Sequence, residues 1–279
     1  MTEKIVELII SDIKTQFKNE HNLDSLSIVG SFANPNKKLE DSNDLDFVII
    51  FDKLTSKNLM NLKSFAKKIR DKYSSKEIDI NYTFKIGPIK ISSKKSKSIL
   101  IHFLVYSKYS FLNYESKTVR YSFQFYPTII GKSINEINGF PEGVNIDLFN
   151  DIDGIPARRS WITSGKIKYI ETVPSGVKIT ETRLKKDTYL EVVFYSILWL
   201  ANDMLRLRKE YYQDIDLEMC KSFKKRFSMA SRGIPLKFYA YKHALRKKGP
   251  FTSAEINKIK EEALGFLNEC ESYLRNKKS

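Results

Sequence analysis

Two short motifs near the amino terminus carry side chains that could do chemistry together. One is a glycine-serine turn, Gly30-Ser31, after an apolar run, and the other is a pair of carboxylates, Asp44 and Asp46. In a β-strand, residues spaced i, i+2 point to the same face, so the two aspartates share a face while Leu45 points into the core. Two carboxylates this close repel each other, and a counter-cation relieves the repulsion. Because Mg²⁺ prefers hard oxygen ligands and is usually shared with substrate phosphates, the spacing predicts a metal-and-phosphate site.

The glycine-serine turn suits a phosphate for two reasons. Gly30 has no side chain, so its backbone can approach an anion closely. Ser31 offers a hydroxyl and a backbone N–H to phosphate oxygens. Either motif alone is common, but the two in this order, each beside its own strand-like run, are rarely found together by chance. We therefore interpret residues 26–52 as a strand pair that carries one site.

In these residues the chain resembles the polymerase-β-type nucleotidyltransferase superfamily. The resemblance implies that Gly30 and Ser31 bind a nucleoside triphosphate, and that Asp44 and Asp46 hold Mg²⁺, with two ions in the complete site. It also implies a third carboxylate on a neighbouring strand, which completes the metal site and activates the acceptor hydroxyl. Paired metal ions stabilise the attacking and leaving oxygens of an in-line displacement. The expected enzyme moves AMP from ATP to a hydroxyl acceptor and releases pyrophosphate.

Two residues compete for the position of the third carboxylate. Asp79 lies in an alternating strand between Ile78 and Ile80, where smaller family members place their third acid. We predict it as a metal ligand and as the general base for the acceptor hydroxyl. In the other alignment, strands 77–91 and 98–106 form a hairpin and His102 takes the position. A histidine at that position would be a departure from the family, which has an acid there. The alternative is that His102 is a core residue, since a lone histidine in an apolar strand is more often buried in the core than part of a site.

Hydrophobic periodicity predicts the elements that would position these residues. Helices are expected at 3–18 and 56–73, and strands at 26–30, 44–51, 77–91 and 98–106. This order predicts an α+β fold in which a small mixed sheet is backed by helices.

The second half of the chain predicts a C-terminal helical bundle domain. Residues 138–156 are rich in Gly, Pro, Asn and Asp and predict irregular structure at a boundary, whereas the basic segment 158–186 has no clear pattern. Helices are predicted at 189–208, 215–230, 235–247 and 253–275, the last opened by the capping box of Thr252 and Glu255. We predict a nucleotidyltransferase catalytic domain at 1–150 and a mainly helical acceptor-binding domain at 151–279. This layout resembles the aminoglycoside-type nucleotidyltransferases.

Charge is distributed unevenly along the chain and bears on the acceptor. The net charge is +15, yet residues 1–52 hold five lysines against ten acids, which leaves 43 basic and 23 acidic residues for the rest. A basic body predicts an anionic partner, and RNA such as the end of a tRNA fits as acceptor. Two alternatives stay open. One is an aminoglycoside-like small-molecule adenylyltransferase, and the other is a catalytically degenerate protein of this fold that binds nucleic acid or a partner.

Cysteine usage and hydropathy bear on the compartment. Cys220 and Cys270 fall on apolar faces of predicted helices, so we expect buried free thiols, which fits a reducing cytoplasm. The amino terminus does not resemble a signal peptide. The longest apolar stretch, 192–200, is far shorter than the roughly 20 residues that cross a bilayer. We therefore expect a cytoplasmic protein without a membrane partner. No carboxylate or cysteine lies at ligand spacing from His21 or His243 in the sequence, so zinc is not predicted.

Overall fold

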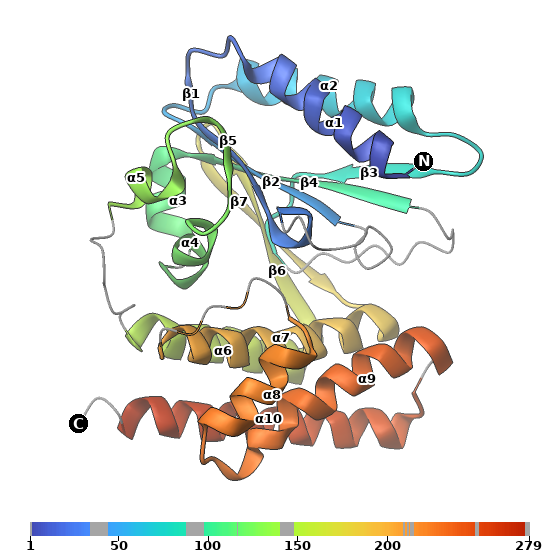
Figure 1. Ribbon diagram of the computed structural model, residues 1–279, viewed down its shortest axis with the longest axis vertical. Coiled ribbons are helices and arrows are strands. Elements are labelled where there is room, and N and C mark those ends of the chain that lie inside the picture. The colour runs from blue at the N-terminus through green and yellow to red at the C-terminus, as the bar shows by residue number, and fades with distance from the viewer. Residues whose placement is uncertain are drawn as a thin grey trace. The chain divides into compact units, whose positions relative to one another are not determined.

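The computed structural model describes residues 2–33, 44–87, 98–115, 117–139, 148–208, 210, 212, 215–248 and 251–276. The chain forms two compact units (Figure 1). The first comprises Met1–Glu142 and Tyr169–Thr180, and the second Gly143–Lys168 and Glu181–Ser279. The catalytic and acceptor-binding roles assigned above to 1–150 and 151–279 stay predictions.

A five-stranded mixed sheet forms the centre of the first unit. Its strands are β1 (Leu23–Val29), β2 (Asp44–Phe51), β3 (Asp79–Thr83), β4 (Ser98–Ser107) and β5 (Thr128–Gly131). Their order across the sheet is β3-β4-β2-β1-β5. β1 runs antiparallel to both β2 and β5, whereas β4 runs parallel to both β2 and β3. The predicted mixed sheet is therefore confirmed, but β3 and β4 do not form the hairpin of the second alignment.

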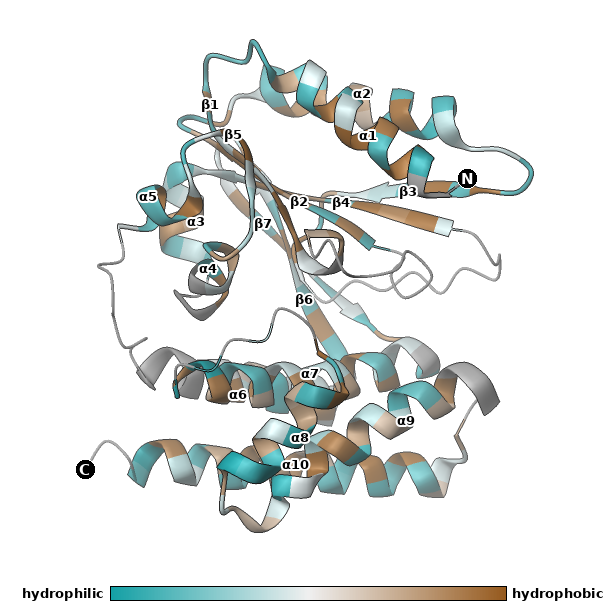
Figure 2. Cartoon of the chain, in the orientation of Figure 1, coloured by the Kyte–Doolittle hydropathy of each residue, from teal (hydrophilic) through white to brown (hydrophobic). Residues whose placement is uncertain are grey.

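Alternation along β2 separates the two faces of this sheet. Leu45 and Phe47 pack in a core with helices α1 (Thr2–Phe17) and α2 (Ser56–Tyr73), whose hydrophobic residues recur at helical spacing (Figure 2). Val48 and Ile50 point to the opposite face and pack in a second core. That core takes side chains from three short helices, α3 (Lys108–Tyr114), α4 (Lys117–Phe123) and α5 (Ile134–Asn138).

The second unit is built around helix α7 (Lys186–Arg206). Its residues Phe194, Ile197 and Leu198 are completely buried, as expected for a bundle helix that is apolar on most sides. Around one common core lie α6 (Leu148–Ser164), α8 (Leu217–Arg226), α9 (Ile234–Lys248) and α10 (Ser253–Asn276). The predicted helical bundle is thus confirmed. Strands β6 (Lys166–Val173) and β7 (Gly176–Arg183) form a separate two-stranded sheet in the segment that carried no clear pattern, and most of their residues belong to the first unit.

The prediction of irregular structure over 138–156 was wrong for its second part. Helix α6 begins at Leu148 and contains Pro156, a residue that removes a backbone donor and disfavours helix interiors. The helix buries Ile155 and Ile162 in the bundle core, and its Arg158 donates to Asp203 over 3.0 Å. These tertiary contacts outweigh the unfavourable local composition. Residues 140–147 lie outside the described part of the chain.

Both cysteines are free and buried, as predicted. Burial away from water raises the pKa of the Cys220 thiol to about 12 and raises the pKa of Cys270 as well. In the described residues, no helix combines the length and the apolar character that a bilayer-spanning segment needs.

The capping box predicted at the start of α10 is present and can be tested. Thr252 donates from both its N–H and its hydroxyl to Glu255, at 2.7 and 2.8 Å, and Glu255 N–H donates back to Thr252 Oγ1 at 3.3 Å. We expect Thr252→Ala to lower the free energy of unfolding by about 1 kcal/mol because the Glu255 N–H loses its acceptor, the Thr252 hydroxyl. Urea denaturation measures this, with Thr252→Ser as the control that keeps the hydroxyl. Equal losses in both variants would contradict a capping role.

Candidate functional site

A tight turn with a left-handed glycine starts the candidate site. Gly30 follows the last residue of β1 and opens the 3₁₀ helix η1 (Gly30–Ala33) with a φ of 74°. Side chains disfavour this φ, so glycine is the residue that fits. Ser31 is the next residue of η1, and its side chain lies outside the described part of the structure. The turn therefore forms where the sequence predicted it.

The two predicted aspartates lie on one face of β2, at its amino-terminal end. Both side chains are half-buried, whereas Leu45 between them is completely buried on the other face. Across the β1–β2 pairing, Asp46 is the partner of Val29, which brings it next to the turn. A Cβ built on Gly30 would lie 2.6 Å from Asp46 Oδ2. Glycine at this position thus gives the turn its backbone conformation and leaves room for the carboxylate.

His102 occupies the position next to Asp46 on the neighbouring strand β4. The two residues are partners in the parallel β2–β4 register, and His102 Nδ1 lies 2.9 Å from Asp46 Oδ1. The other ring nitrogen, Nε2, lies 2.8 Å from the backbone carbonyl oxygen of Lys85. The ring is 11% exposed, so it contacts protein on nearly all sides. The prediction that His102 is a core residue describes its burial but not its partner. The side chain is buried, and it also pairs with Asp46, a predicted site residue.

The hydrogen-bond partners of His102 define its charge. A carbonyl oxygen and a carboxylate oxygen are both acceptors, so both ring nitrogens must donate unless the carboxylate holds the proton. Imidazole is the stronger base of the two groups, so it takes the proton and becomes positively charged. Burial alone lowers the pKa of His102, but the hydrogen bond and negative charge of Asp46 outweigh burial and raise the pKa above its ordinary value. The site therefore contains an ion pair.

Asp79, the other candidate for the third acid, lies away from this group. On β4 its register partner is Ser98, four residues before His102, which corresponds to about 13 Å along the strand. β4 also separates β3 from β2. Asp79 accepts a hydrogen bond from its neighbour Asn81 at 2.9 Å. At the level of His102, the β3 residue is Thr83. The geometry thus brings together Gly30, Asp44 and Asp46, adds His102, and does not bring in Asp79.

One contributor to the site was missed by reasoning from the sequence. Lys85 acts through its backbone carbonyl, which every residue type has, so no sequence signal could have identified it. The residue after Lys85, Ile86, exchanges backbone hydrogen bonds of 2.6 and 2.9 Å with Ile170, and these bonds hold the segment in place. The Lys85 ammonium lies over the ring of Tyr169, 5.5 Å from its centroid. These contacts hold the acceptor that orients His102.

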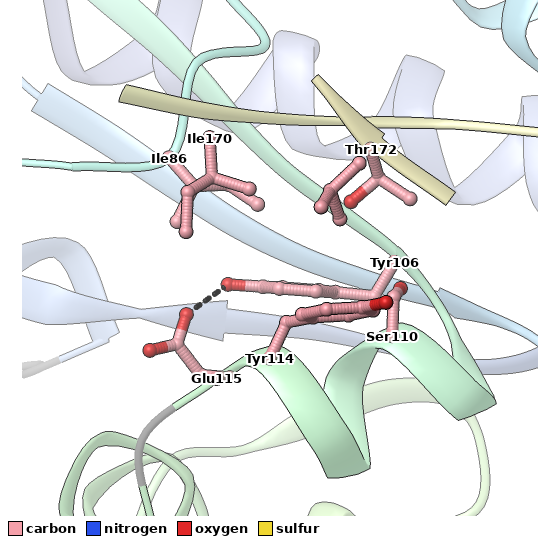
Figure 3. Close-up of a pocket in the computed structure, with 8 residues that line it drawn as sticks. Ile86, Tyr106, Ser110, Tyr114, Glu115, Ile170 and Thr172 are labelled. Carbon is pink, nitrogen blue, oxygen red and sulfur yellow. Dashed lines mark hydrogen bonds between the residues drawn. The ribbon is translucent and has the colours of Figure 1, made fainter. Parts of the chain in front are cut away.

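A small pocket lies further along the same face of β4 (Figure 3). Tyr106 lines it and donates a 2.6 Å hydrogen bond to Glu115, and Thr172 Oγ1 is buried there without a partner among the described residues. Burial and the nearby Glu115 carboxylate raise the pKa of Tyr106 well above its ordinary value, so the phenol stays neutral. The space for water-sized molecules is about 10 Å³, room for about one water. This pocket is too small for a nucleotide.

Asp44 and Asp46 are the residues of this site whose side chains fit a divalent cation. Asp44 and Asp46 supply hard carboxylate oxygens of the kind that Mg²⁺ prefers, and Oδ2 of Asp46 lies at the glycine turn. Oδ1 of Asp46 already accepts from His102. Within the described ranges, no group of three or more His, Cys, Asp or Glu side chains is arranged to hold a metal ion. The third ligand expected from the family is therefore not found beside the aspartate pair in these ranges.

Comparison with known proteins identifies the fold. No protein-family model matches the chain, and no curated protein matches it in sequence. Among solved structures, the chain is similar to the spectinomycin adenyltransferase AAD(9) from Enterococcus faecialis, determined with ATP and spectinomycin. The TM-score is 0.55 at 13% sequence identity, and the match covers 96% of this chain and 100% of the other. The chain thus has the nucleotidyltransferase fold that the resemblance in the sequence predicted.

Proposed function

We propose that this chain is a metal-dependent nucleotidyltransferase that transfers AMP from ATP to a hydroxyl acceptor and releases pyrophosphate. The observation that carries the proposal is the position of Asp46, next to Asp44 on one strand face and with Oδ2 against the Gly30 turn. The closeness of Asp46 Oδ2 to Gly30 supports a site in which the two carboxylates and the turn bind one ligand. The likeness to an enzyme determined with ATP supports the choice of nucleotide.

Each residue has a distinct role in the proposal. Gly30 lets the backbone approach the triphosphate, and Ser31 contributes its backbone N–H. Asp44 and Asp46 would hold Mg²⁺, which supplies charge neutralisation at the phosphates when bound. His102 orients Asp46 through the 2.9 Å hydrogen bond. Asp79 has no part in this version of the site because its register partner lies four residues from His102.

The acceptor we propose is RNA, such as the end of a tRNA. Residues after Asp52 hold 43 basic against 23 acidic side chains, which favours a polyanion over a cationic drug. The competing acceptor is a small molecule, because the similar solved enzyme was determined with spectinomycin.

A second candidate function is nucleotide binding without transfer. The observation that favours it is His102, a cation at the place where the family resemblance implies an acid. Such a protein would bind ATP with Mg²⁺ but release no pyrophosphate with any acceptor.

One assay separates these possibilities. We expect pyrophosphate release from ATP and Mg²⁺ to rise on addition of tRNA, and the tRNA-dependent rate to fall at least tenfold between about 50 and 200 mM salt, as phosphate contacts are lost. Spectinomycin serves as the small-molecule comparison. Stimulation by spectinomycin alone would contradict the RNA acceptor. If neither tRNA nor spectinomycin led to pyrophosphate release, but the chain bound Mg²⁺ and ATP tightly, the second candidate function would remain.

A further inference from the structure

His102 has a consequence for the number of metal ions at the site. Two metal ions in one site lie about 3.5–4 Å apart, so their positive charges repel and need shared anionic ligands. A carboxylate bridges two ions either by giving one oxygen to each or by sharing a single oxygen, and the second mode holds the two positive charges closer together. Asp46 is the carboxylate best placed to be shared, since it lies between the Gly30 turn and β4.

One of the two Asp46 oxygens is already engaged. Oδ1 accepts the 2.9 Å hydrogen bond from His102, and only Oδ2 faces Gly30. His102 cannot easily turn away, because its other nitrogen donates to the Lys85 carbonyl and its ring is 11% exposed. Asp46 therefore has one oxygen, Oδ2, available to bind an ion, while Oδ1 stays hydrogen-bonded to His102.

The charge of the group points the same way. Three carboxylates would present three negative charges to two divalent ions. Asp44 and Asp46 supply two of these charges, and the imidazole of His102, which lies beside Asp46, supplies no third. Within the described residues, Asp79 does not make up the difference, since its register partner is four residues from His102 and its carboxylate accepts from Asn81.

We infer that this site binds a single divalent ion with its nucleotide, held by Asp44 and by Oδ2 of Asp46, and that His102 is a positioning residue in the place of a second ion and its carboxylate ligand. The inference rests on the proposed function, because it concerns the same nucleotide site. It deepens that proposal by defining how many ions the site takes and which residue limits the number.

Electron paramagnetic resonance of bound Mn²⁺ tests this count without relying on activity. The unchanged chain is loaded with Mn²⁺ and α,β-methylene ATP, an analogue that cannot transfer its nucleotide. Two Mn²⁺ ions about 3.5–4 Å apart give a spin-coupled spectrum, whereas one ion does not. We expect the unchanged chain to bind one Mn²⁺ and to show no coupling.

Two substitutions at one position identify the limiting residue. His102→Asp adds a carboxylate beside Asp46, and we expect it to raise the count from one ion to two with a coupled spectrum. His102→Asn keeps a donor toward Asp46 without adding a carboxylate, and we expect it to retain one ion. Thermal melting monitored by circular dichroism checks that both variants fold.

The outcomes separate this inference from the function on which it rests. A coupled pair in the unchanged chain would overturn the inference while supporting the proposed function. A single ion in a folded His102→Asp variant would also overturn it. Absence of both nucleotide and Mn²⁺ binding to the unchanged chain would instead remove the proposed function, and the inference with it.

Discussion

An Asp46→Asn variant is expected to release pyrophosphate about 10³-fold more slowly than the unchanged chain. Metal ions contribute several kcal/mol of charge stabilisation, and each 1.36 kcal/mol corresponds to about tenfold in rate. The amide oxygen can still accept from His102 in place of Oδ1, so the fold should tolerate the change. The amide nitrogen beside Gly30 cannot bind a cation. The assay is pyrophosphate release from ATP with Mg²⁺ and tRNA.

Two further carboxylates make this result specific. Asp52 follows β2 directly and is exposed, so Asp52→Asn is a matched control that should leave the rate unchanged. Asp79→Asn tests whether Asp79 serves as the third acid or whether His102 occupies that position. If it lost as much activity as Asp46→Asn, the role predicted for Asp79 from the sequence would return, despite its register four residues from His102. Full activity in Asp46→Asn would remove the proposed site altogether.

A Gly30→Ala variant is expected to lose both stability and activity. A side chain at a φ of 74° costs about 1–2 kcal/mol. The new Cβ would also lie 2.6 Å from Asp46 Oδ2, so the carboxylate or the turn must move. Displacing a reacting group by about 1 Å can cost about 10²-fold in rate, and we expect a fall of that size. Urea denaturation and the pyrophosphate assay measure the two effects.

Gly139 provides the matched control for this variant. It has a similar φ of 60°, at the end of α5, but a Cβ there would meet nothing within 4 Å. Gly139→Ala therefore carries the backbone strain without the contact to Asp46. We expect it to lose stability and to keep its rate of pyrophosphate release. If Gly30→Ala behaved in the same way, the contact between Gly30 and Asp46 would have no role in the chemistry.

Local periodicity predicted several elements closely. The predicted strand at 44–51 and helix at 56–73 coincide with β2 and α2. Both have a strong repeat of buried residues, which is a property of neighbouring positions. The prediction was incorrect where tertiary contacts outweighed composition, as in α6 with Pro156 in its interior. The short elements α3, α4, β5 and α5 between 108 and 138 were not predicted, because such short segments show little periodicity.

The sequence by itself determined that Asp44 and Asp46 share a face and that a glycine-serine turn precedes them, because side-chain alternation in a strand and backbone freedom at glycine are local properties. The sequence did not determine whether Asp79 or His102 lies beside Asp46. The tertiary structure decided this, since strand order and register result from packing between segments that are far apart in the chain. That packing put β4 beside β2, and it made an imidazole ring rather than a third carboxylate the partner of Asp46.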